Sequence, residues 1–163
     1  MKKTLLIVIA AAVLMLSGCA SLRLSPEEKA QIAEQIQENL DNRTFLIDVD
    51  QMLPRRGGSR HVTGFSLKVD GDRLISNLPY FGQAWNVPYG GGKGLSFESD
   101  IADYIETYPK ADSRQIALTT YNGEDNFLYI IEVYTNGKAV IEVRSRNRET
   151  ISYYGTVSTK LEN

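Results

Sequence analysis

The side chains that could support nucleophilic catalysis are few and scattered in this 163-residue sequence. His61 is the only histidine and Cys19 is the only cysteine. A serine, threonine or cysteine nucleophile needs a base held beside it. No Gly-x-Ser-x-Gly segment, the strained turn that presents a nucleophilic serine, occurs. The sequence therefore predicts no nucleophile–base pair.

Carboxylates are the other residues to weigh, because two of them can hydrolyse a glycosidic bond without histidine. Each candidate alternates with apolar residues along a predicted strand, which is typical of a solvated sheet face. The candidates are Asp48, Asp50, Glu132 and Glu142. We therefore expect no enzyme, with a hydrolase acting on envelope or dietary glycans as the alternative.

Neither a phosphate loop nor a metal site is predicted. A P-loop requires Gly-x4-Gly-Lys-Ser/Thr, but Lys93 is followed by Gly94, and Val87 stands in place of the first glycine. The acidic groups Asp70-Gly71-Asp72 and Glu124-Asp125 resemble turns, where short side chains bond the nearby backbone. We expect no cofactor and no bound metal.

The segment Leu78–Phe97 holds the strongest candidate for ligand binding. It is rich in aromatic residues and glycine and shows no apolar period, which predicts a long structured loop. Aromatic rings stack on sugars and other flat apolar faces. The candidate binding residues are Tyr80, Trp85, Tyr89 and Lys93. The sequence favours the simpler interpretation that these aromatics fold over an open end of the sheet and plug it, and a plug and a binding site can coexist.

The charge of the chain disfavours nucleic acid as a partner. The net charge is −2, and removal of Lys2 and Lys3 would leave 16 basic against 20 acidic residues, or −4. Nucleic-acid binding depends on neutralising phosphates. Arg144, Arg146 and Arg148 form a local basic tip, which we interpret as a solvated hairpin end. An anionic glycan or a protein partner is the alternative there.

The amino terminus is predicted to be a targeting segment. Lys2 and Lys3 precede the apolar run Leu5–Leu16, which is too short to span a bilayer. Leu16-Ser17-Gly18-Cys19 resembles the bacterial lipobox. This resemblance implies cleavage before Cys19, a diacylglycerol on its thiol and acylation of its new amine.

The predicted organisation is therefore a signal peptide over 1–18, a lipidated tether over 19–24 and one domain over 25–163. By the sorting rules of such lipoproteins, Ala20 implies the outer membrane. Ser21–Leu24 lacks the acidic residues of surface-exported lipoproteins, which implies the periplasmic face. The membrane is the expected partner through the lipid, together with an unidentified small molecule, glycan or protein.

One helix is predicted at the start of the domain. Ser25-Pro26-Glu27-Glu28 forms a capping box with proline at the first helical position. An apolar stripe of Ile32, Ile36 and Leu40 would pack on the body of the protein, and a helix that binds a partner is the alternative.

From Thr44 onward the apolar period is two, which predicts antiparallel strands joined by hairpins. A three-residue loop Thr135–Gly137, with Gly137 left-handed, places Ile131 opposite Ile141, whereas a two-residue turn would set it opposite Glu142. The predicted fold is mainly β: the helix followed by an antiparallel meander of about eight or nine strands, in a curled sheet or partly closed barrel. Two stacked sheets are the alternative.

Several motifs resemble an uncharacterised lipoprotein domain of Bacteroides-type bacteria, domain of unknown function 4251. They are Leu78-Pro79-Tyr80-Phe81-Gly82, Pro88-Tyr89-Gly90, Asn136-Gly137-Lys138-Ala139 and Arg148-Glu149-Thr150-Ile151-Ser152-Tyr153-Tyr154-Gly155. The resemblance implies the location and the fold, and it carries no catalytic residue, substrate or cofactor. We expect a lipid-anchored envelope protein that is a non-catalytic binding or structural module.

Overall fold

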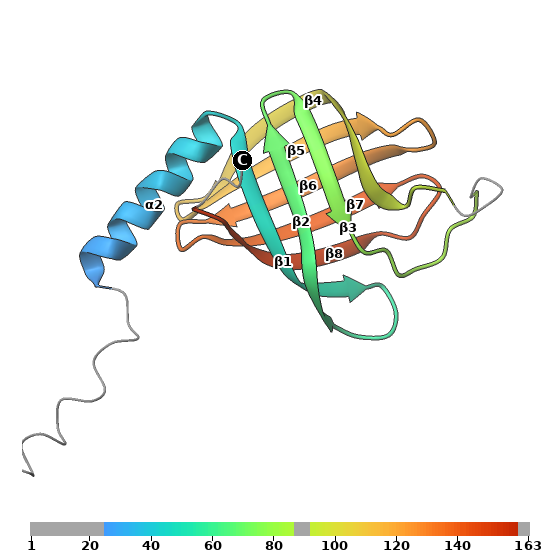
Figure 1. The fold of residues 1–163 in the computed structure, drawn as a ribbon, viewed down its shortest axis with the longest axis horizontal. Coiled ribbons are helices and arrows are strands. Elements are labelled where there is room, and N and C mark those ends of the chain that lie inside the picture. The colour runs from blue at the N-terminus through green and yellow to red at the C-terminus, as the bar shows by residue number, and fades with distance from the viewer. Residues whose placement is uncertain (1–24, 87–91, 160–163) are drawn as a thin grey trace, which may run out of the picture. The chain divides into compact units, whose positions relative to one another are not determined.

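The computed structural model describes residues 25–86 and 92–159. One helix precedes eight antiparallel strands, and the strands close into a barrel in chain order (Figure 1). The elements are α2 (Pro26–Asp41), β1 (Thr44–Pro54), β2 (Arg60–Asp70), β3 (Arg73–Leu78), β4 (Leu95–Lys110), β5 (Ser113–Tyr121), β6 (Asn126–Tyr134), β7 (Lys138–Ser145) and β8 (Ile151–Val157). The predicted class is confirmed, and the barrel is completely closed.

Closure depends on the pairing of β1 with β8, from Ile47 opposite Val157 to Pro54 opposite Ile151. Gly155 lies opposite Val49, just before the register shifts on β1. A Cβ atom on Gly155 would lie 2.3 Å from the carbonyl oxygen of Asp48. Glycine is therefore required where the two strands meet.

The predicted hairpin register around Gly137 is confirmed. Ile131 pairs with Ile141 and Tyr129 with Val143, and Gly137 has a φ of 81°. A one-residue slip would turn every apolar side chain of the hairpin outward. Burial of one face therefore selects the longer loop.

The hairpin between β4 and β5 turns at Ala111 and Asp112, since β4 continues to Lys110, which pairs with Ser113. Register shifts after Ile101 and Thr107 interrupt the alternation of β4.

The barrel interior is filled by the inward side chains of all eight strands, including Phe45, Phe97, Phe127, Tyr129 and Tyr153. The Tyr129 hydroxyl donates to Ser76 Oγ at 3.1 Å, and Ser76 Oγ donates to the Leu95 carbonyl at 2.7 Å. The buried hydroxyl groups of these two residues are therefore satisfied.

Helix α2 begins with the predicted capping box. The Glu28 amide donates to Ser25 Oγ at 3.1 Å, and the Ser25 amide donates to Glu28 Oε2 at 2.7 Å. Further along, Ile36 and Leu40 are buried with the barrel core. No helix among the described residues has the length and apolar composition needed to cross a membrane.

Candidate functional site

Four connections gather at one end of the barrel because the strands alternate in direction. They follow β1, β3, β5 and β7, and we call this the loop end (right-hand side of Figure 1). The opposite end holds the β2–β3, β4–β5 and β6–β7 turns. The predicted binding segment lies at the loop end, between β3 and β4.

Part of this segment is held as a short strand. Ala84 pairs with Arg148 in an antiparallel bridge. The Trp85 amide donates to the Asn147 carbonyl at 2.8 Å, and the Glu149 amide donates to the Gln83 carbonyl at 2.9 Å. We call residues 83–85 and 147–149 the latch. The latch fixes the backbone that carries Trp85.

Arg148 of the latch forms a buried ion pair with Asp125 of the β5–β6 turn. Arg148 Nε is 3.9 Å from Asp125 Oδ2, and both side chains are buried. Asp125 also accepts hydrogen bonds from Ser145 Oγ at 2.7 Å and from Asn147 Nδ2 at 3.1 Å. The basic tip expected from Arg144, Arg146 and Arg148 is therefore wrong for Arg148, whose charge is compensated inside the protein.

Tyr80 lies half-buried against this pair. Its hydroxyl donates to the Gln83 carbonyl at 2.8 Å and lies 3.2 Å from the Glu149 carbonyl. Burial raises the pKa of Tyr80 above its ordinary value, while the hydrogen bond to the Glu149 backbone opposes that rise. Tyr80 therefore joins the β3–β4 connection to the latch.

Two aromatic side chains of the same segment face solvent. Trp85 is 63% exposed and Phe81 is 47% exposed. The Arg60 guanidinium lies over the Phe81 ring, 3.8 Å from its centroid. The expectation that this segment plugs the barrel is wrong for Trp85, whose side chain is largely exposed. Phe81 and Arg60 were not among the predicted binding residues, because they are far apart in the sequence and only the structure shows their contact.

The remaining predicted site residues are placed as follows. Lys93 is exposed, and its amide donates to Glu124 Oε2 at 3.1 Å, which ties the segment to the β5–β6 turn. Tyr89 and Cys19 lie outside the described residues. The structure thus brings Tyr80, Trp85 and Lys93 to one end of the barrel, with different exposure.

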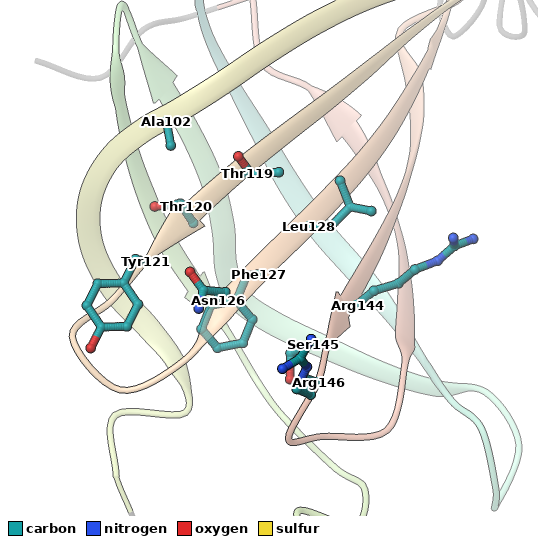
Figure 2. Close-up of a pocket in the computed structure, with 10 residues that line it drawn as sticks. All are labelled: Ala102, Thr119, Thr120, Tyr121, Asn126, Phe127, Leu128, Arg144, Ser145 and Arg146. Atoms are coloured by element: carbon teal, nitrogen blue, oxygen red, sulfur yellow. The ribbon is translucent and has the colours of Figure 1, made fainter.

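A shallow hollow of about 400 Å³ lies on the outer wall beside the loop end. Figure 2 shows its lining across β4 to β7, with Tyr121 on one side. The Arg144 side chain extends away from the Tyr121 ring and pairs with Glu142. Tyr121 therefore adds a third exposed ring near the loop end.

Of the residues considered for catalysis, Asp48, Asp50 and His61 line one open hollow of about 580 Å³ on the outer wall at β1 and β2, whereas Glu132 and Glu142 lie on β6 and β7. His61 is exposed at the start of β2, and the four candidate carboxylates lie on the outer face of their strands. Within residues 25–86 and 92–159, no group of three or more His, Cys, Asp or Glu side chains could hold a metal ion.

Comparison with known proteins gives a family and a fold. A family profile described as "Domain of unknown function (DUF4251)" matches residues 27–157. The chain is also similar to the crystal structure of a DUF4251 family protein from Bacteroides eggerthii, with a TM-score of 0.61 and 16% identity. That similarity covers 78% of this chain and 87% of the other. No curated protein is significantly similar to the chain.

Proposed function

Because the chain belongs to the DUF4251 family, whose function is unknown, we propose its role from the geometry. We propose a lipid-anchored, non-catalytic module of the outer membrane that binds a saccharide at the loop end of its barrel. The lipid is attached to Cys19, and the domain faces the periplasm.

The support for the anchor is the sequence. A basic start, a short apolar run and Leu16-Ser17-Gly18-Cys19 occur in the order that lipoprotein precursors require. Several acyl chains, each contributing ~0.8 kcal/mol per buried CH₂, hold a protein stably on a membrane.

The support for binding is the exposure of Trp85 and Phe81 on a fixed backbone. Exposed rings on an ordered segment bind without first losing much conformational freedom. The Trp85 backbone is held by the hydrogen bond that its amide donates to the Asn147 carbonyl, and Phe81 adjoins Tyr80, whose hydroxyl donates to the Gln83 carbonyl. Apolar rings with polar groups beside them suit the faces and hydroxyl groups of sugars.

Lipidation is tested by metabolic labelling with an alkyne analogue of palmitate. We expect the full chain to incorporate the label and to fractionate with the outer membrane. Cys19→Ala should lose both properties, since it removes the only cysteine. Equal labelling of the two proteins would refute the anchor.

Binding is tested by calorimetry of the full chain in detergent against neutral and charged oligosaccharides. The double variant Phe81→Ala/Trp85→Ala should weaken binding about tenfold, since each ring pair contributes roughly 0.5–1.5 kcal/mol. Tyr154→Ala is the matched control, because Tyr154 is an exposed aromatic on β8, outside the loop end. Unchanged affinity in the double variant would refute this binding surface.

A further inference from the structure

A second hollow of about 340 Å³ opens at the loop end, beside Phe81. Three connections form it: Arg56 from β1–β2, the turn at Gly82 from β3–β4, and Glu149 from β7–β8. Tyr80 and Gln83 complete the lining. We call it the Glu149 hollow.

The carboxylate of Glu149 is incompletely satisfied by the described residues. Its side chain is only 7% exposed, and Oε2 accepts the Gln83 amide at 3.1 Å. Oε1 has Arg56 Nε at 3.9 Å, which is too long for a hydrogen bond. The Arg56 side chain is 74% exposed, so solvent weakens this ion pair. A buried carboxylate gains much more from a close, hydrogen-bonded cation.

The aromatic wall of the hollow already holds a cation. The Arg60 guanidinium is stacked on Phe81, and aromatic faces attract cations electrostatically. Arg56 comes from the exposed connection after β1, and Arg60 is the first residue of β2, with an exposed side chain. Both side chains can therefore move aside without disturbing the barrel strands. The nearby charge of Arg148 is compensated by Asp125 and does not repel a second cation as a free arginine would.

We propose that the Glu149 hollow binds a protonated amino group. The saccharide bound at the loop end would therefore be one that carries free amines. The ammonium donates to Glu149 Oε1 in place of Arg56, and the adjoining sugar ring lies against Phe81. This inference rests on the proposed function and names the substrate class of the same surface. An acidic ligand group would meet the buried Glu149 carboxylate and is disfavoured.

The test compares two tetrasaccharides, of glucosamine and of N-acetylglucosamine, under mildly acidic conditions where the free amines are protonated. The full chain in detergent is titrated, and the fluorescence of Trp85, the only tryptophan, reports binding beside the latch. We expect the glucosamine tetramer to bind at least about tenfold more tightly, as for a charged hydrogen bond.

Three variants separate charge from structure. Glu149→Gln keeps an oxygen for the Gln83 amide and should abolish the preference for the amine. Arg56→Ala removes the internal competitor and should tighten binding of the glucosamine tetramer by about two- to fivefold. Because Arg56→Ala predicts a gain, it also keeps the proposal testable if Glu149→Gln folds poorly. Glu142→Gln, a carboxylate paired with Arg144 on the barrel wall, should leave both affinities unchanged.

The outcomes distinguish this inference from the function on which it rests. Equal binding of the two tetramers, or an intact preference in Glu149→Gln, overturns the amine site and leaves saccharide binding standing. Tighter binding of an oligogalacturonate also overturns the amine site. Failure of every saccharide to bind overturns the proposed function itself.

Discussion

Trp85 and Tyr153 are both aromatic residues near the loop end, but they have opposite surroundings. Trp85 is largely exposed, whereas Tyr153 fills the barrel interior and donates from its hydroxyl to the Pro79 carbonyl at 2.6 Å. Burial raises the pKa of Tyr153 far above its ordinary value, so the hydroxyl remains protonated and donates.

We therefore expect Trp85→Ala to change the free energy of unfolding by less than about 0.5 kcal/mol, as surface substitutions do. Tyr153→Phe should lower it by about 1 kcal/mol or more, because the Pro79 carbonyl loses its donor. Chemical denaturation followed by circular dichroism measures both. A large loss in Trp85→Ala would restore the plug interpretation.

Glu132 supplies a prediction about pH. Partial burial opposes ionisation, but hydrogen bonds from Ser113 Oγ at 2.9 Å and Lys110 Nζ at 3.3 Å lower the pKa of Glu132 below its ordinary value of 4.5. The stabilisation is therefore complete above pH 4.5 and is lost as the pH falls through the lowered pKa.

Glu132→Gln should unfold at a lower temperature than the parent at neutral pH, and the difference should disappear in strong acid. Thermal unfolding at several pH values measures this. Asp48→Asn, on the exposed face of β1, is the control that should show no comparable change. A pH-independent difference would contradict the assignment.

The sequence predicted which residues could bind but not how each one is placed. Tyr80 and Trp85 are both aromatic residues of the same glycine-rich segment, so the sequence does not distinguish them. In the structure the Tyr80 hydroxyl donates to the Gln83 carbonyl of the latch, whereas the Trp85 side chain is exposed. The contacts of Arg60 with Phe81 and of Arg148 with Asp125 join residues that lie about twenty positions apart in the sequence. Local pattern carries no information about such pairs.

Among the elements, β1 and β8 show how closely strands must approach to close the barrel. Ile151, Tyr153, Gly155 and Val157 are all buried on one face of β8. At Gly155 the space for a side chain is occupied by the backbone of β1. The alternation predicted this face, but nothing in the sequence indicated that β1 would lie there.

Gly155→Ala should destabilise the protein by about 3 kcal/mol or more, because the added methyl overlaps the Asp48 carbonyl. Hydrogen exchange should increase first in β1 and β8. Thr156→Ala, an exposed neighbour in the same strand, should be close to neutral. Comparable losses in both variants would contradict the steric explanation.

Helix α2 is fastened to the barrel through Arg114 of β5. The Arg114 side chain is buried and donates through Nη2 to Gln37 Oε1 at 3.1 Å and to Asp41 Oδ1 at 2.6 Å. Nη1 lies 3.7 Å from Glu106 Oε2. The apolar stripe of the helix was predictable, but this polar attachment was not.

Arg114→Met should speed amide exchange in residues 31–41 and lower the free energy of unfolding by about 1–2 kcal/mol. Hydrogen-exchange mass spectrometry measures the first effect. Arg144→Met removes an exposed arginine from β7 and should leave exchange in the helix unchanged. If Arg114→Met also leaves it unchanged, Ile36 and Leu40 alone hold the helix.

At the scale of the whole molecule, hairpin-by-hairpin reasoning predicted the strand order because neighbouring strands in the chain are neighbours in the barrel. The exception is the closing pair, in which Ile47 meets Val157. No local pattern decides between an open curled sheet and a closed barrel. That decision depends on twist accumulated over all eight strands.

This closing pair predicts slow folding. Residues far apart in the chain must be brought together, at a cost in chain entropy, before their contacts stabilise the barrel. We therefore expect folding in milliseconds to seconds, as is typical of all-β domains. Stopped-flow refolding measures the rate. Unfolding should be a single transition by Trp85 fluorescence and by circular dichroism, and two separated transitions would contradict a single closed barrel.

The filled interior of the barrel has a consequence for how a ligand binds and leaves. Phe97, Phe127 and Tyr129 occupy the space in which carrier barrels enclose a cargo molecule. A molecule captured at the loop end would stay in contact with bulk water, and its departure would need no gate to open. Residence times should therefore be short and set by contact area, which suits a protein that samples its surroundings more than one that transports a passenger.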